Sequence, residues 1–318
     1  MGSEKPQLPT INFKGLDLNE PLGSNWETAR TEVLAALKIY GCFDAVYDGV
    51  QPEVNEALFH SIMPEMFALP LEVKQTNKSN VYMGYIGQIT DVAYESLRIQ
   101  DAPSPESVER FAGMLWPEGN QKFCNTVTTY AQQARNLEQI VETMIFQSLG
   151  IEKYCKSHLE SLVYGVRLSN YGGLPIEEAK VSLPAHVDPN LITIVRQNGV
   201  EGLEVYTKDG ECIRVVPSPD TFTVMIGESM TVLTNGRFRA PLHCVSVNQK
   251  RYSALLSSLP KEGYLIQPLK EMVNENHPLQ FHPFDINKYM QFKYTPEGLK
   301  IENPLKVFCG AQEQKNND

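Results

Sequence analysis

Evenly spaced, short β-rich runs fill the second half of the chain. From about residue 160 onward, turn signals such as Asn198-Gly199, Asp209-Gly210 and Asn235-Gly236 separate these runs. Many short strands with such turns are typical of a β-sandwich or barrel. The runs that we expect to be strands are LVYGVRLSNY, LITIVRQ, GLEVY, ECIRVV, TFTVMI, MTVLT, LHCVSV and RYSALLSSL.

The first 120 residues have a mixed pattern. TINF (10–13) and CFDAVY (42–47) predict short strands, whereas apolar residues at helical spacing predict helices over residues 25–39 and 51–67. Residues 78–120 contain several glycines and prolines, and we expect them to be largely loop with short elements.

The clearest helix is predicted over residues 124–148, where one apolar stripe runs at i, i+3, i+4 and i+7 and Gly150 follows as a C-cap. The tail, about 269–295, is expected to return to helix. We therefore predict a mainly β core with flanking α-helices. A mixed α/β region (1–120) would pack on a catalytic domain (121–318), and the two would form one structural unit.

Charge and composition exclude several classes of protein. The net charge of −10 and the lack of a dense Lys/Arg run argue against nucleic-acid binding. The chain has no run of 18 apolar residues and no secretory signal pattern, so we expect a cytoplasmic protein outside the membrane. Its six cysteines lie far apart without a C-x-x-C pair, which predicts free thiols. A monomer is the default expectation.

The segment LPAHVDPNL (183–191) carries a His-x-Asp pair. Alternate residues on a strand face the same side, so His186 and Asp188 are expected to point together. Two histidines and one carboxylate on one face of a metal are the ligand set of non-haem Fe(II) oxygenases. Of the other five histidines, His243 lies within a β run of the same region, and a closed barrel can bring the two strands together. Taken alone, such a pair is more often a structural or surface pair than a metal site.

A second cluster of polar residues suits a carboxylate. Arg251 and Ser253 share a strand face, and an inward guanidinium beside a hydroxyl offers a bidentate fork and one more hydrogen bond. Upstream, VRLSNY places Arg167, Ser169 and Tyr171 on one face, and Tyr171 is a further hydroxyl donor.

These segments, in this order, resemble the plant Fe(II)/2-oxoglutarate-dependent dioxygenases. LPAHVDPNLITIVRQNGVEGLEV, TFTVMIGESMTVLTNGRFRAPLHCVSV and RYSALLSSLP look like the C-terminal half of that family, and LPTINF, YGCFDAVYDGV and MFALPLEVKQ look like its N-terminal domain. The resemblance covers about residues 8–295. Three segments resemble the branch of the family that contains the glucosinolate side-chain dioxygenases and the steroidal glycoalkaloid hydroxylases. They are YGCFDAVYDGV, VYMGYIGQ and AYESL.

The resemblance implies a double-stranded β-helix, or jelly roll. His186, Asp188 and His243 would hold Fe(II), and Arg251 and Ser253 would bind the distal carboxylate of 2-oxoglutarate, assisted by Tyr171. The cosubstrates would be 2-oxoglutarate and O2, the products succinate and CO2, and ascorbate would stimulate turnover. The substrate would be a small molecule of plant specialised metabolism, most often hydroxylated but in some relatives desaturated, cyclised or demethylated.

This chain departs from the family pattern at Ser169, where the family commonly has an asparagine that helps to orient the keto acid. If the register holds, Ser169 takes that place, and Asn170 points the other way. By position, five residues are candidates for the substrate pocket, although each can be simple packing: Met83, Tyr85, Ser257, Leu259 and Phe292.

Two alternatives stay open. One is an iron oxidase of the same fold that takes its electrons from ascorbate or from its substrate. The other is a jelly-roll binding protein without catalysis, in which the metal site is vestigial or structural. Strict dependence of turnover on 2-oxoglutarate separates the first alternative from the dioxygenase, and oxygen consumption separates the second.

Overall fold

The computed structural model describes residues 6–78, 83–89, 92–172 and 183–311. The larger of its sheets consists of β1 (Thr10–Asn12), β2 (Cys42–Val46), β3 (Tyr94–Ile99), β4 (Leu162–Tyr171), β6 (Ile192–Gln197), β9 (Thr221–Ile226) and β11 (Arg251–Pro260). The strand order is β1-β2-β9-β6-β11-β4-β3, and every neighbouring pair is antiparallel except β1–β2.

The second sheet is smaller. It consists of β5 (Leu183–His186), β7 (Leu203–Tyr206), β8 (Cys212–Arg214) and β10 (Leu242–Val245), in the antiparallel order β5-β10-β7-β8. A separate two-stranded ribbon joins β12 (Leu265–Ile266) to β13 (Phe284–Asp285).

The two main sheets pack face to face. Tyr171 and Val195 from the larger sheet and Val205 and Val245 from the smaller one belong to one buried apolar cluster. Side chains alternate between the faces of a strand, so the neighbouring residues of β4 and β6 point outward. There, Leu168 and Ile194 join the core beneath the helices. Two antiparallel sheets packed in this way form the jelly roll that the sequence predicts.

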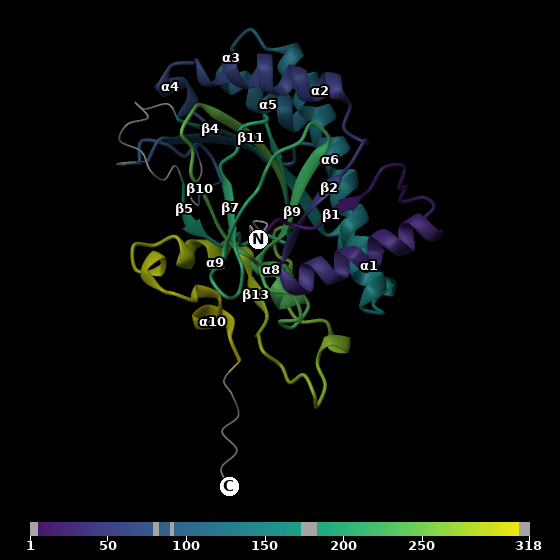
Figure 1. Ribbon diagram of the computed structural model, residues 1–318. Coiled ribbons are helices and arrows are strands. Elements are labelled where there is room, and N and C mark those ends of the chain that lie inside the picture. The colour runs from purple at the N-terminus through teal and green to yellow at the C-terminus, as the bar shows by residue number, and fades with distance from the viewer. Residues whose placement is uncertain (1–5, 79–82, 90–91, 173–182, 312–318) are drawn as a thin grey trace, which may run out of the picture.

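Helices lie against the outer face of the larger sheet, at the top of the molecule and at its lower left (Figure 1). They are α1 (Ser24–Ile39), α2 (Pro52–Ala57), the π-helical turn η1 (Leu58–Ile62), α3 (Met63–Phe67), α4 (Leu71–Lys74), α5 (Pro105–Leu115), α6 (Gln121–Ser148), α7 (Cys155–Glu160), α8 (Glu228–Leu233), α9 (Ile286–Lys293) and α10 (Pro304–Cys309). Short 3₁₀ turns lie at Glu152–Tyr154, Lys270–Met272 and Gly298–Lys300. In Figure 1, α2 to α5 lie at the top, and the C-terminal α9 and α10 lie at the lower left.

Helix α6 connects the helical layer to the sheet. Its first turn is capped by Asn120, whose side chain accepts a hydrogen bond from the backbone N–H of Phe123 at 3.0 Å. Midway along the helix, the Tyr130 hydroxyl donates to the backbone carbonyl of Ala254 in β11 at 3.1 Å. None of the helices in the described ranges is long and apolar enough to cross a membrane.

Most predicted elements are confirmed. The predicted strands at 10–13 and 42–47 are β1 and β2, the helix at 25–39 is α1, and the helix at 124–148 is α6. The helix predicted over 51–67 is built from α2, η1 and α3 in succession. All six cysteines are free thiols. The boundary at residue 120 stays a prediction, and β1, β2 and β3 from the first part of the chain pair into the larger sheet.

The segment over 78–120, expected to be largely loop with short elements, contains two regular elements that the sequence analysis did not locate. Residues 94–99 form β3, which pairs with β4 along its whole length. Residues 105–115 form α5, which starts at a proline and buries Val108, Phe111, Ala112 and Leu115. This spacing of i, i+3, i+4 and i+7 is helical, and the glycines and prolines around it masked the signal.

The run MTVLT was predicted as a strand, and the structure shows it as part of helix α8. Most of this helix is buried, so its sequence has no polar face from which a helical period can be recognised. Gly227, just before α8, lies so close to the chain that a Cβ atom would come within 2.0 Å of the Asn190 carbonyl oxygen. The tail returns to helix over part of its predicted range, in α9.

A buried carboxyl on α6 gives a prediction about stability. Burial, and then the neighbouring Glu142, raise the pKa of Glu138 well above its ordinary value. The folded state therefore keeps a proton that the unfolded chain loses above about pH 4.3. The contribution of Glu138 to the free energy of unfolding is therefore fully present below that pH, and it is lost as the pH rises through the pKa of the folded state.

We therefore expect Glu138→Gln to increase the free energy of unfolding at pH 8 by on the order of 1–2 kcal/mol, and to change it little at pH 5. Denaturant unfolding at the two pH values measures this, with Glu32→Gln on the exposed surface of α1 as the control for net charge. A stability difference that is the same at both pH values would contradict the assignment.

Candidate metal centre

Two histidines from neighbouring strands face each other in the smaller sheet. His186 ends β5, His243 lies in β10, and the two residues are direct partners in the antiparallel register. Their ring centroids are 4.3 Å apart. Four strands of the chain lie between β5 and β10, and the jelly-roll topology brings the two together as the sequence analysis expected.

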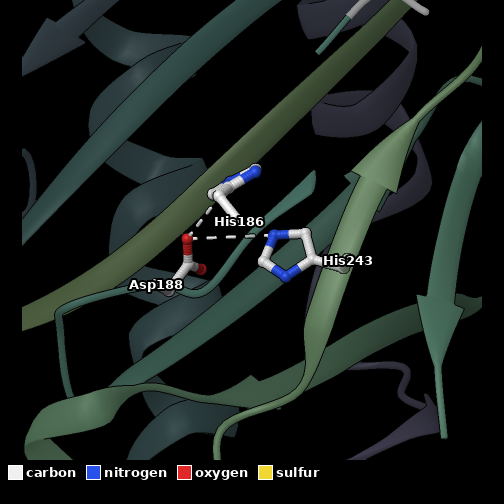
Figure 2. Close-up of side chains that lie close together, drawn as sticks. All are labelled: His186, Asp188 and His243. Carbon is white, nitrogen blue, oxygen red and sulfur yellow. Dashed lines mark ion pairs between the residues drawn. The ribbon is translucent and has the colours of Figure 1, made fainter. Parts of the chain in front are cut away.

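Asp188 completes the group. It lies two residues past the end of β5, and its Oδ1 atom is 3.7 Å from His186 Nε2 and 3.9 Å from His243 Nε2. Figure 2 shows the three side chains pointing toward one another. Each offers one ligand atom, and these atoms all lie within 4.8 Å of one another. In the part of the chain that the structure describes, this is the group of His, Cys, Asp or Glu residues that can hold a metal ion.

The backbone determines which nitrogen of each histidine is available. His186 Nδ1 lies 2.8 Å from the carbonyl oxygen of Pro184, and His243 Nδ1 lies 3.2 Å from that of Pro241. A carbonyl only accepts, so in each ring Nδ1 carries the proton and Nε2 presents its lone pair to the shared centre. Burial and the nearby His243 lower the pKa of His186 to about 4, so this ring is neutral at pH 7.

Hydrogen bonds orient the carboxylate. The Thr193 hydroxyl donates to Asp188 Oδ2 at 2.6 Å, and the Asn190 amide donates to Thr193 Oγ1 at 2.9 Å. Burial opposes ionisation of Asp188, but the two imidazoles and the Thr193 hydroxyl hold its pKa below the ordinary value. Asp188 is therefore a charged ligand with one oxygen directed to the histidines.

A lysine from the C-terminal helix anchors the loop between His186 and Asp188. Lys293 of α9 is buried, and its ammonium donates to the carbonyl oxygen of Val187 at 2.7 Å. It also donates to Glu228 Oε2 at 2.5 Å, and Glu228 accepts a further hydrogen bond from the Tyr289 hydroxyl at 2.8 Å. The backbone between the two metal-ligand candidates is thus attached to a distant part of the chain.

The second predicted cluster lies on the inner face of the larger sheet. Arg251 is 1% exposed, and its Nη2 atom donates to Gln197 Oε1 at 2.7 Å. Its guanidinium lies 4.7 Å from the centre of the Tyr171 ring. In the described ranges, Nε and Nη1 of Arg251 are buried without a hydrogen-bond partner. Unpaired buried N–H groups of a cation are costly, and they suit a bidentate anion.

Ser253 and Tyr171 lie beside Arg251. Both are buried, and the Ser253 hydroxyl is 3.4 Å from the Tyr171 hydroxyl. Ser169 is the register partner of Ser253, but its hydroxyl lies 3.3 Å from that of Tyr94. The structure therefore brings Arg251, Ser253 and Tyr171 together, and it places Ser169 next to them in contact with a second tyrosine.

The five candidates for the substrate pocket lie in three different parts of the structure. Ser257 lies on the inner face of β11, opposite Thr193 of β6. Leu259, Met83 and Phe292 belong to one apolar cluster with α9 and α10. Tyr85 lies elsewhere, because its hydroxyl donates to Glu95, a residue on the outer face of β3, at 3.4 Å. The structure does not bring Tyr85 to the metal ligands, and the role of the other four in a pocket stays a prediction.

Sequence reasoning missed the contribution of β3 and, in α9, of Lys293. Tyr94 packs against Tyr171 with ring centroids 5.0 Å apart, and Arg98 from the same face of β3 reaches Ser257. The alternation in YESLRI was a usable signal, but the segment was predicted as loop. For Lys293, the sequence holds no signal, because only the tertiary structure brings α9 to the metal-ligand loop.

Comparison with known proteins decides the family. Residues 161–257 match the family model of the 2OG-Fe(II) oxygenase superfamily. Residues 8–111 match a second family model, which is described as "non-haem dioxygenase in morphine synthesis N-terminal". The "Probable 2-oxoglutarate-dependent dioxygenase AOP1.2" of Arabidopsis thaliana is 39% identical over 311 residues, which cover 95% of this chain and 96% of the relative. The chain belongs to the 2OG-Fe(II) oxygenase family.

One further relative and one solved structure are similar to this chain over most of its length. The "Probable inactive 2-oxoglutarate-dependent dioxygenase AOP2" of Arabidopsis thaliana is 33% identical, over 98% of this chain and 100% of the relative. Among solved structures, a dioxygenase for auxin oxidation from Arabidopsis thaliana, in complex with 2-oxoglutarate, superposes with a TM-score of 0.74 at 25% identity. That match covers 86% of this chain and 100% of the solved one. The His-Asp-His triad of the family is present here.

The anchoring lysine gives a prediction. Replacing Lys293 with Met removes the hydrogen bond to Val187 and leaves the buried Glu228 without its cation, so the loop between His186 and Asp188 loses its support. Groups that orient metal ligands typically contribute 10–100-fold to metal affinity. We expect Lys293→Met to weaken Fe(II) binding by about that factor, measured by anaerobic titration.

Lys288→Met is the matched control, since Lys288 lies on the same helix but is exposed. Its Fe(II) affinity should equal that of the wild type. Equal affinity in Lys293→Met would show that the loop keeps its geometry without the lysine.

Proposed function

We propose that this protein is an Fe(II)- and 2-oxoglutarate-dependent dioxygenase that hydroxylates a small molecule of plant specialised metabolism and releases succinate and CO2. The observation that carries the proposal is the buried Arg251, whose Nε and Nη1 atoms have no hydrogen-bond partner among the described residues, on the same sheet face as Thr193, which orients Asp188. Desaturation, cyclisation or demethylation would use the same residues.

The donor set fits Fe(II). Two neutral imidazole nitrogens and one carboxylate oxygen are the ligands of the facial triad, which leaves other positions of the metal open. We propose that His186, Asp188 and His243 supply these ligands. When bound, the iron supplies the activation of O2 and the oxidation of the substrate; the protein supplies ligand orientation, through Pro184, Pro241 and Thr193.

The inner face of β11 and β6 connects the two parts of the site. Arg251 lies at one end of β11, and Ser257, six residues along, is the register partner of Thr193, which holds Asp188. A dicarboxylate with one end on Arg251 would lie along this face with its other end toward the triad. Burial lowers the pKa of Arg251, yet an arginine stays charged at neutral pH, so a carboxylate is the matching ligand.

We propose that the Arg251 guanidinium and the Ser253 hydroxyl bind the distal carboxylate of 2-oxoglutarate. The Tyr171 ring supports the guanidinium through a cation–π contact. Ser169 is in contact with Tyr94, so a direct bond from Ser169 to the keto acid stays a prediction. The cytoplasmic location, the monomeric state and the stimulation by ascorbate likewise stay predictions from the sequence.

Removal of the arginine tests the cosubstrate site. Arg251→Leu removes at least two charge-assisted hydrogen bonds, each contributing about 1.5–3 kcal/mol, so we expect 2-oxoglutarate affinity to fall by 100-fold or more, to an order of magnitude. Anaerobic addition of 2-oxoglutarate to the Fe(II) protein, followed by the visible absorption band of the chelate, measures this affinity. Ser253→Ala should weaken it by about tenfold. Unchanged affinity in Arg251→Leu would contradict the assignment.

Oxygen consumption tests the reaction class. We expect O2 uptake by the Fe(II) protein to require 2-oxoglutarate and to be lost in His243→Ala, because that variant lacks one metal ligand. An ascorbate-type oxidase would consume O2 without 2-oxoglutarate. A binding protein would bind the keto acid and show no uptake with any compound in a broad metabolite panel.

A further inference from the structure

A second buried arginine lies on the inner face of the larger sheet. Arg98 of β3 is 7% exposed. Its Nη1 atom donates to the Ser257 hydroxyl at 2.8 Å, and its Nε atom donates to Gln100 Oε1 at 3.4 Å. In the described ranges, Nη2 is buried without a hydrogen-bond partner, and Arg98 is in no ion pair. A buried cation with an unpaired N–H group is costly, and an anion is the acceptor that compensates it best.

A glycine makes room for this guanidinium. The Arg98 side chain crosses β4 at Gly165 on its way from β3 to β11. A Cβ atom at position 165 would lie 2.5 Å from Arg98 Nη2 and 2.7 Å from Cζ. Any other residue at this position would displace the guanidinium, so the position of the free N–H group depends on Gly165.

The free N–H group lies near the metal triad. Ser257, which holds Nη1, has two register partners: Gly165 on β4 and Thr193 on β6. Thr193 is the residue that donates to Asp188. The guanidinium is therefore one strand away from the residue that orients the metal ligand. Burial, and then Arg167, lower the pKa of Arg98 to about 9, and Asp188 has a smaller opposite effect. The guanidinium is therefore still charged at neutral pH.

Arg98 and Arg251 have different protein partners. Ser257 and Arg251 lie six residues apart on β11, and Arg251 has its own partners in Gln197 and Tyr171. Both oxygens of Asp188 face other groups, Oδ1 the two histidines and Oδ2 the Thr193 hydroxyl. Arg167, the register partner of Arg98, adds a second positive charge to this region.

We propose that Arg98 binds an anionic group of the substrate, a carboxylate or a sulfate, and that the substrate is therefore a small organic anion. The proposal deepens the proposed function and rests on it, since it assigns the substrate class of the same site. Ser257 and Gln100 hold the guanidinium, Gly165 gives it space, and Nη2 donates to the anion. The bond to Arg98 places the rest of the molecule beside the metal triad.

Matched pairs of acids and neutral analogues test the proposal. The probes are 3-phenylpropanoate with 3-phenylpropanamide, and hexyl sulfate with hexan-1-ol. Binding is followed by perturbation of the chelate band in the anaerobic protein with Fe(II) and 2-oxoglutarate, and by thermal shift of the metal-free protein. We expect the anion of at least one pair to bind the wild type more than tenfold tighter than its neutral partner.

Variants assign this preference to Arg98. Arg98→Gln should weaken binding of the anion by 10–100-fold and leave the neutral analogue unchanged, because a charged hydrogen bond contributes about 1.5–3 kcal/mol. Arg98→Lys keeps the positive charge but loses the bidentate geometry of the guanidinium. Its affinity for the anion should therefore lie between those of the wild type and Arg98→Gln. Gly165→Ala keeps the arginine and displaces it, so it should weaken the same anion. Arg214→Gln is the control for net charge, because that arginine is 58% exposed and pairs with Glu204.

Two results would overturn the proposal. One is equal binding of anions and neutral analogues, or of wild type and Arg98→Gln, across both pairs. The other is loss of anion binding in Arg214→Gln to the same extent, which would indicate attraction by net charge alone. Absence of the chelate band in the wild type would instead contradict the proposed function, while the thermal shift of the metal-free protein would still report on Arg98.

Discussion

The site depends on the register between β5 and β10. His186 and His243 are opposite each other in this pair, and the chain turns just after β5 so that Asp188 faces both. A shift of one residue in either strand would direct a histidine to the other face of the sheet. The packing of the smaller sheet against the larger one, through residues such as Val205 and Val245, therefore determines whether the three ligand atoms meet.

Groups from distant parts of the chain hold this arrangement in place. The carbonyls of Pro184 and Pro241 orient the imidazoles, Thr193 of β6 orients the carboxylate, and Lys293 of α9 attaches the loop between the two ligands. Because these supports come from both sheets and from a C-terminal helix, the ligand geometry is coupled to the folding of the whole domain. A metal would bind here to a site that the protein has already assembled.

The inner face of the larger sheet contains cations with unsatisfied N–H groups. Arg251 at the start of β11 and Arg98 on β3 are both buried, and both keep at least one N–H group without a partner in the described ranges. Burial of an unpaired guanidinium destabilises a protein, so such groups are typical of places where a ligand supplies the missing acceptor. The two guanidinium groups have different partners, Ser257 for Arg98 and Gln197 for Arg251, so each has its own place on the sheet to accept an anion.

The sequence by itself determined the fold class, the strands that carry His186 and His243, and the shared strand face of Arg251 and Ser253. These features follow from local alternation, turn residues and residue type, which short segments contain in full. It did not determine β3, α5 or the helical state of α8, because glycines and prolines near the first two, and the burial of most of α8, hide the period in those segments. Only the tertiary structure decided that Lys293 reaches Val187 and that Arg98 crosses Gly165 to Ser257, because such contacts depend on how distant segments pack, and no short stretch of sequence contains that information.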